Sequence, residues 1–135
     1  MNLFRETPYS DMEEMLKKDE IAQRFGVKLL DYGKGWCRLS MAVKKEMLNA
    51  YGAAHGAAVY ALADCAFAIA GNSFGTKSVA LSVTINYRRP VGENEELTVE
   101  AREESRGRTT TLCRMIVTTS DGKVVALADG LSFLG

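Results

Sequence analysis

The stretch NAYGAAHGAAVYALADCAFAIAGNSFG, residues 49–75, decides how this chain folds. Nine of the eighteen residues from Ala53 to Ala70 are alanine, a strong helix former. Because the run is apolar on nearly every side, it predicts a buried helix whose small side chains let the surrounding backbone approach closely. The same stretch holds the chain's single histidine, His55, and a carboxylate, Asp64. A charge among apolar side chains is costly to bury without a partner, so Asp64 requires an explanation.

Strand patterns flank this helix on both sides. Two strands are expected before it, at residues 27–32 and 36–43. In the second strand one face is apolar: Cys37, Leu39, Met41 and Val43. After the helix, alternation in residues 79–87 predicts one apolar face: Val79, Leu81, Val83, Ile85 and Tyr87. Three more strand patterns follow at 96–104, 109–119 and 123–134, with turns predicted at Arg106-Gly107-Arg108 and Ser120-Asp121-Gly122.

Residues 10–26, SDMEEMLKKDEIAQRFG, predict one amphipathic helix that ends at Gly26. Ser10 followed by Glu13 resembles a capping box at its start. The predicted order is therefore a helix, two strands, a long buried helix and four strands. One antiparallel sheet wrapped around a central helix satisfies this order, in a single domain of 135 residues with an N-terminal helical segment, 1–25, and a core, 26–135.

The bulk composition excludes several classes of partner. Lys plus Arg (17) equals Asp plus Glu (17), and this balance argues against a general nucleic-acid or membrane-surface binder. The longest apolar run, Ala57–Ala63, is too short to span a bilayer, and the first twenty residues have no apolar core of a secretory signal. The three cysteines, Cys37, Cys65 and Cys113, are odd in number and far apart, which predicts reduced thiols in a cytoplasmic protein.

The expected start of the long helix carries a second feature, the pair His55-Gly56. The first N–H groups of a helix lack internal partners and lie at the positive end of its dipole, and Gly56 has no side chain to block access to its own N–H. A carbonyl oxygen held there is stabilised as it becomes an oxyanion. The structural alternative is that Gly56 only permits tight packing and that Asp64 accepts hydrogen bonds from a neighbouring loop.

Geometry constrains how these two features can work together. Eight residues separate Gly56 from Asp64, which is roughly 12 Å along a helix. One carbonyl group therefore cannot contact both on the same helix. If both act on one substrate, the helix start of one chain must face Asp64 of a second chain. An antiparallel helix pair across a two-fold axis does this and creates two equivalent sites, so the site hypothesis requires a dimer.

The combination Asn49…Gly52…His55-Gly56…Leu62-Ala63-Asp64, followed by VTINYRRP, resembles the hotdog-fold acyl-CoA thioesterases of the phenylacetate-degradation (PaaI-like) group. The likeness covers about residues 25–135. It implies an α+β hotdog fold, in which an antiparallel sheet wraps around a long central helix, here with an additional N-terminal helix. It also implies thioester hydrolysis at the interface of a homodimer that often pairs again into a homotetramer. No cofactor is implied, because coenzyme A is part of the substrate.

The resemblance assigns roles to residues by position. Asp64 matches the catalytic acid, acting as general base on water or as the nucleophile. Gly56 matches the backbone donor to the thioester oxygen, and Asn49 matches an amide that helps hold the thioester or the water. His55 resembles a supporting residue near the helix start. Ser82 falls near a position where some members use a hydroxyl to orient water.

The last assignment has an alternative, because Thr84 suits the same role nearly as well. The arginines at strand ends are candidates for contacts with the phosphates of coenzyme A: Arg88, Arg89, Arg106 and Arg108. The alternative is that these side chains are simply solvated at turns.

Other chemistries are disfavoured. Cys65 is expected to be a core cysteine rather than an acyl-accepting thiol, because its surroundings are largely alanine. His55 has no companion histidines, so no metal site is expected. A hotdog enoyl-CoA hydratase or dehydratase and a non-catalytic acyl-CoA-binding protein remain as alternatives. Aryl-acetyl, benzoyl-type and medium-chain acyl groups would all suit an apolar pocket.

Overall fold

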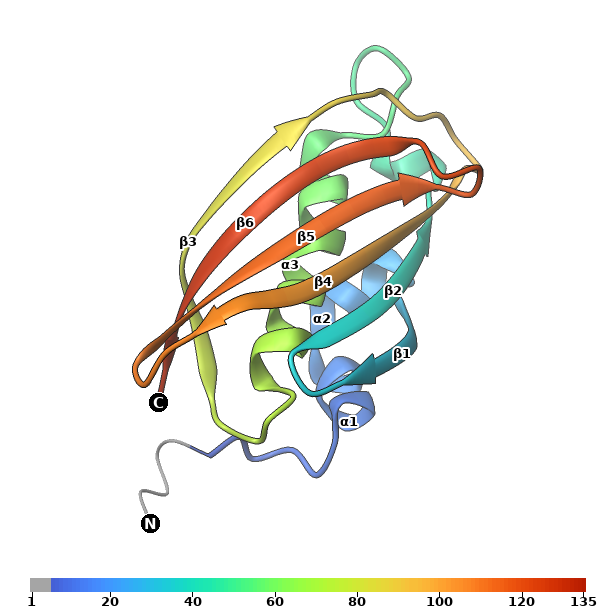
Figure 1. Cartoon of the computed structure of the whole chain (residues 1–135). Coiled ribbons are helices and arrows are strands. Elements are labelled where there is room, and N and C mark those ends of the chain that lie inside the picture. Colours follow the sequence, from blue (N-terminus) through green and yellow to red (C-terminus); the bar gives the residue numbers. More distant parts are fainter. Residues whose placement is uncertain (1–5) are drawn as a thin grey trace.

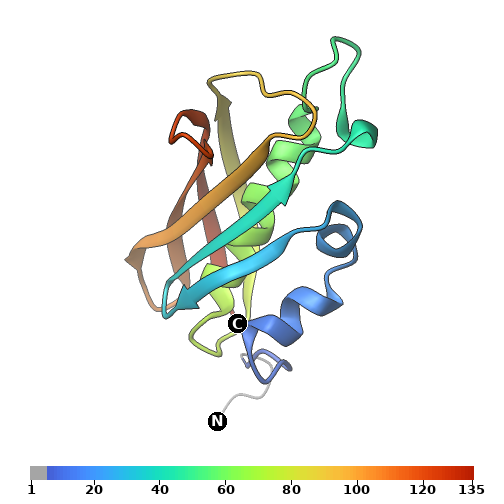
Figure 2. The ribbon, with the colours of Figure 1, turned by 90° about the vertical axis from the view of Figure 1, so that its right-hand side faces the viewer.

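The structure is a computed structural model that describes residues 6–135, so the first five residues of the predicted N-terminal segment lie outside it. Its elements are α1 (Met12–Lys18), α2 (Glu20–Phe25), β1 (Lys28–Gly33), β2 (Trp36–Ala42), η2 (Lys45–Met47), α3 (Gly56–Asn72), β3 (Ser78–Tyr87), β4 (Glu96–Arg106), β5 (Thr110–Thr119) and β6 (Val124–Leu134). The six strands form one antiparallel sheet in the order β1-β2-β4-β5-β6-β3, which curves around α3 (Figures 1 and 2). The predicted sheet around a central helix, the hotdog arrangement, is confirmed.

The core lies between α3 and the concave face of the sheet. The strands β2, β4 and β5 bury alternate side chains against the helix: Cys37, Leu39, Met41, Leu97, Val99, Ala101, Cys113, Met115 and Val117. This confirms the predicted apolar face of the second strand, and Val43 continues it into the core just after the strand ends. The helix presents small residues to the sheet, so the two backbones come close. Where α3 carries a large side chain, Phe67, the small residue is on the sheet, since a Cβ at Gly130 would lie 2.7 Å from the Phe67 ring.

The predicted single N-terminal helix is wrong, because the structure divides it into α1 and α2 at Asp19. Asp19 has extended backbone angles (φ −82°, ψ 105°), and its side chain caps α2 by accepting the Ala22 N–H at 3.0 Å. The predicted capping box is shifted by one residue, since Asp11 is the N-cap of α1 and accepts the Glu14 N–H. The end at Gly26 is confirmed, and this glycine has the left-handed conformation (φ 68°).

Strand β3 differs from its predicted face pattern because a bulge interrupts its pairing with β6 between Ala80 and Ser82. Beyond the bulge, Val83 and Ile85 pack against the core as predicted. Before it, Val79 pairs with the exposed Phe133 and therefore lies on the other face. Strand β3 lies at the edge of the sheet. Val79 and Leu81 on it remain 46% and 59% exposed, so the edge carries an apolar surface.

Candidate functional site

The start of α3 presents an open backbone donor. His55 is the N-cap residue, and its Nδ1 accepts the Ala57 N–H at 2.9 Å, so the imidazole holds the first turn in place. The Gly56 N–H donates to no acceptor within residues 6–135, as expected for the first residue of a helix. The structure thus places His55 in a supporting position and leaves the Gly56 N–H available for a ligand oxygen.

The loop before the helix is organised by Asn49. Its Oδ1 accepts the N–H groups of Tyr51 at 2.9 Å and of Ala53 at 3.1 Å, and its backbone N–H donates to the Ala53 carbonyl at 2.7 Å. The Asn49 side-chain carbonyl is therefore engaged in shaping the loop. Its amide NH₂ is the half of the side chain that remains to contact a substrate or a water molecule.

Tyr87 is a residue at this site that the sequence reasoning did not assign. Its hydroxyl donates to the Gly56 carbonyl at 2.9 Å, and its ring would lie 3.2 Å from a Cβ at position 56. The side chain, 50% exposed, thereby fixes the helix start against the end of β3. The sequence feature that could have identified Tyr87 is its place in VTINYRRP, directly before Arg88.

A groove of about 420 Å³ opens at this end of the molecule. It is lined by Asn49, Ala53, Ala54, Gly56, Val59, Tyr87, Arg88, Arg89, Pro90, Val91 and Val125. The groove brings together four of the predicted site residues: Asn49, Gly56, Arg88 and Arg89. The backbone N–H groups of both arginines donate to the Val125 carbonyl, at 2.7 and 3.3 Å, which anchors the segment while both residues remain exposed.

Asp64 lies outside this groove. It shares one face of α3 with Gly56 and Tyr60, at intervals of four residues, and all three are half-buried in a helix whose other faces are covered. Burial raises the pKa of the Asp64 carboxyl, and the nearby negative charge of Asp19 raises it further. Since two helical turns, roughly 12 Å, separate Asp64 from Gly56, the two groups do not meet within one chain.

The other predicted residues are also apart from the groove. Ser82 and Thr84 flank Val83, which pairs with the helix-facing Gly130, so both hydroxyls project from the face of the sheet opposite α3. Arg106 binds Glu103 at 2.6 Å and stacks on Phe74 at 4.1 Å.

The turn between β4 and β5, which contains Arg108, lies at the end of the sheet opposite the start of α3 (Figure 1). Of the four arginines proposed to contact coenzyme A, only Arg88 and Arg89 are therefore placed with Gly56.

Cys65 is a buried thiol, 5% exposed, whose Sγ donates to an Asp19 oxygen at 3.7 Å. Burial raises the pKa of this thiol far above neutrality, so the prediction of a core cysteine is confirmed and a nucleophilic role is disfavoured. Within residues 6–135 no group of three or more His, Cys, Asp or Glu side chains could hold a metal ion. In the same part of the chain, no helix combines the length and the apolarity needed to cross a membrane.

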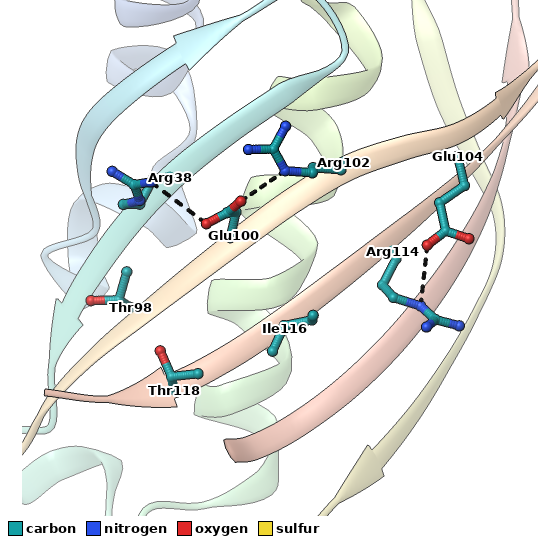
Figure 3. A pocket seen from close by; sticks show the side chains of 8 residues that line it. All are labelled: Arg38, Thr98, Glu100, Arg102, Glu104, Arg114, Ile116 and Thr118. Carbon is teal, nitrogen blue, oxygen red and sulfur yellow. Dashed lines mark hydrogen bonds and ion pairs between the residues drawn. The ribbon is translucent and has the colours of Figure 1, made fainter. Parts of the chain in front are cut away.

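A second depression, of about 360 Å³, lies on the convex face of the sheet (Figure 3). Its charged residues pair with one another: Glu100 binds Arg38 at 3.6 Å and Arg102 at 2.8 Å, and Glu104 binds Arg114 at 3.5 Å. It contains none of the predicted site residues. The groove beside Gly56 is therefore the candidate site.

Comparison with known proteins identifies the family of the chain. The sequence matches the thioesterase superfamily over residues 51–126, which include the start of α3 and Asp64. It is 32% identical over 124 residues to the acyl-coenzyme A thioesterase PaaI of Escherichia coli, covering 92% of this chain and 89% of that protein.

Solved structures show the same fold. The E. coli PaaI structure superimposes with a TM-score of 0.90 at 31% identity and covers 93% of this chain and 91% of PaaI. A Thermus thermophilus protein gives a TM-score of 0.83 at 38% identity, covering 86% of this chain and 97% of that one. A Streptococcus mutans protein solved bound to acetyl-CoA gives 0.78 at 28% identity, covering 81% of this chain and 88% of that one.

Proposed function

The chain belongs to the thioesterase superfamily and is a thioester hydrolase, and from this premise we propose that it hydrolyses an acyl-CoA to the free acid and coenzyme A at a site shared by two subunits. Asp64 of one subunit acts as general base or nucleophile. The N–H of Gly56 of the partner subunit polarises the thioester carbonyl. The Streptococcus mutans relative, solved with acetyl-CoA, supports the substrate class.

One observation carries this proposal. The open Gly56 N–H and the half-buried Asp64 carboxyl lie on the same uncovered face of α3 but roughly 12 Å apart along its axis. When α3 of a second copy packs antiparallel to this helix, Gly56 of each chain meets Asp64 of the other. The pair of chains therefore has two equivalent sites. The apolar edge of β3, with Val79 and Leu81 exposed, supports burial of this side of the molecule by a second copy.

The chemistry follows from this pairing. With Asp64 as base, water attacks the acyl carbon as its proton moves to the carboxylate, and the oxyanion is held by the Gly56 N–H. Collapse restores the carbonyl and breaks the C–S bond, and the coenzyme A thiolate receives the proton from Asp64. With Asp64 as nucleophile, the carboxylate attacks directly, thiolate leaves, and water then hydrolyses the mixed anhydride.

A thiol-release assay over a panel of acyl-CoAs tests the activity. The panel includes aryl-acetyl, benzoyl and medium-chain acyl-CoAs, since the groove does not distinguish among them, and free coenzyme A is detected with a thiol reagent. We expect release from at least one member of the panel at a rate proportional to enzyme concentration. Absence of release from every member would contradict the proposal.

The dimer geometry makes a prediction about Tyr60. If Gly56 faces Asp64 of the partner subunit, each residue of one antiparallel helix faces the partner residue whose number, added to its own, gives 120. Tyr60 therefore faces the Tyr60 position of the partner subunit, on the two-fold axis. A Tyr60→Cys variant is therefore expected to form an intersubunit disulfide under mild oxidation, seen as a dimer on a non-reducing gel. The native cysteines Cys37, Cys65 and Cys113 are all buried and contribute little background.

The matched control for this cross-link is Ala68→Cys. Residue 68 is on the same helix and partly exposed, but the proposed pairing separates its two copies by about 24 Å along the axes. Efficient cross-linking of Ala68→Cys, with none of Tyr60→Cys, would exclude this register of the helix pair.

The arginines lining the groove give another prediction. Changing Arg88 and Arg89 together to alanine is expected to raise KM for acyl-CoA about tenfold with little change in kcat, because charge-assisted bonds to the coenzyme A phosphates are lost. Steady-state kinetics measure this effect, with Arg108→Ala as the control at the other end of the sheet. A rise in KM for Arg108→Ala alone would place the nucleotide at that end instead.

A further inference from the structure

The N-terminal segment brings a second carboxylate to the proposed site. Both α1 and α2 contact α3, and the helical conformation is interrupted between them at Asp19. The extended backbone of Asp19 lets its side chain turn toward α3 at the level of Asp64 and Cys65. The sequence alone predicts one continuous helix over these residues, without the break at Asp19.

Two contacts fix the Asp19 carboxylate in place. One oxygen accepts the Ala22 N–H at 3.0 Å, and Ala22 itself is fully buried. The other oxygen accepts a weak hydrogen bond from Cys65 Sγ at 3.7 Å, and Cys65 is the residue directly after Asp64. Both carboxylate oxygens therefore have a hydrogen-bond partner, and one of these partners adjoins Asp64 in the sequence.

Few charged or titratable groups of the described residues lie around Asp64. Among residues 6–135, Asp19 is the charged group that acts on the Asp64 carboxyl, and the charge of Asp64 in turn raises the pKa values of Tyr60 and Cys65 on α3. Cys65 stays protonated because burial raises its pKa. The strands β2, β4 and β5 turn apolar side chains and the buried thiols of Cys37 and Cys113 toward α3.

We propose that Asp19 is a positioning residue for hydrolysis: its fixed carboxylate at the start of α2 sets the pH range in which Asp64 works as a base. The inference rests on the proposed function. A second negative charge disfavours ionisation of its neighbour. A carboxylate whose proton affinity is raised toward the working pH takes a proton from water more readily, so Asp19 makes Asp64 a stronger base.

The test removes the charge of Asp19 and keeps its cap. Asparagine is as good an N-cap as aspartate and retains an acceptor for the Ala22 N–H. In Asp19→Asn, the pKa of Asp64 is expected to fall, so the acidic limb of the kcat/KM profile against pH moves to lower pH. The basal rate above this limb also decreases, because the base is weaker. The profile is a readout that a purely structural cap would not move.

The matched control is Asp11→Asn. Asp11 caps α1 in the same manner, accepting the Glu14 N–H at 2.8 Å, but it does not act on Asp64. Its profile is expected to superimpose on that of the wild type. Asp19→Ser, a second neutral N-cap, replaces Asp19→Asn if thermal unfolding shows that the asparagine variant does not fold.

The outcomes separate this inference from the proposed function. An acidic limb shifted for Asp19→Asn and unshifted for Asp11→Asn supports the inference. An unshifted limb for Asp19→Asn, with activity abolished in Asp64→Asn, overturns the role of Asp19 alone. Full activity in Asp64→Asn overturns the proposed function and this inference together.

Discussion

Asp64→Asn is expected to lower kcat for acyl-CoA hydrolysis by roughly 10²- to 10⁴-fold, the usual contribution of a positioned acid or base. The amide has the size of the carboxylate but can neither take a proton from water nor attack the acyl carbon. Thiol release under saturating substrate measures the loss. Asp31→Asn, at an exposed position of β1, is the control and is expected to retain wild-type kcat.

The same substitution is expected to leave the fold intact. Burial raises the pKa of Asp64 in the folded chain, so ionisation disfavours the folded state as pH rises through that raised pKa. A neutral asparagine removes this penalty, and Asp64→Asn should unfold at the same or a higher temperature than the wild type at neutral pH. Wild-type kcat in this variant would exclude Asp64 from the chemistry.

Gly56→Pro is expected to lower kcat by roughly 10²- to 10³-fold, the loss measured when one oxyanion donor is removed. Proline deletes the N–H and is well tolerated at the first position of a helix. His55, with φ −61° and ψ 139°, already has the conformation that a following proline requires. The experiment therefore removes the donor while it preserves α3.

The control for this substitution is Gly56→Ala. Both variants add a Cβ that would lie 3.2 Å from the Tyr87 ring, which must shift slightly. Only proline removes the N–H, so the difference in kcat between the two variants reports the loss of the donor together with the ring carbons that take its place. Equal losses in both would assign the effect to crowding at Tyr87 and would remove the Gly56 N–H from the mechanism.

Mixing the two inactive variants tests whether subunits share a site. In a heterodimer of Asp64→Asn and Gly56→Pro, one site carries both defects and the other carries neither. Random reassociation after denaturation and refolding is therefore expected to restore about a quarter of wild-type activity. Recovery of none would show that Asp64 and Gly56 act within one chain or do not act together.

Much of the geometry of the candidate site could be predicted from the sequence because Gly56 and Asp64 lie on one regular helix. The spacing from His55-Gly56 to Asp64 fixes their common face and their separation, whatever surrounds them. Tertiary details could not be predicted in this way. The bulge beside Leu81 changes which face Val79 occupies, and alternation alone contains no signal for an extra residue in a strand.

The break at Asp19 was missed for a different reason. Residues 10–26 have a continuous helical pattern, and each residue from Met12 to Phe25 except Asp19 is helical. What selects the break is the cap that Asp19 provides to α2 and its contact with Cys65, which is 46 residues away in sequence. Long-range contacts of this kind also explain why Tyr87 could not be assigned to Gly56.

The exposed edge of β3 has a consequence for how the protein is made and handled. Its unpaired N–H and C=O groups and the apolar side chains of Val79 and Leu81 can pair with an exposed strand of another chain. In the proposed dimer the second subunit covers this side of the molecule and keeps other strands away from it. When the proposed dimer separates, aggregation through this edge is the expected failure, and it is faster at high protein concentration.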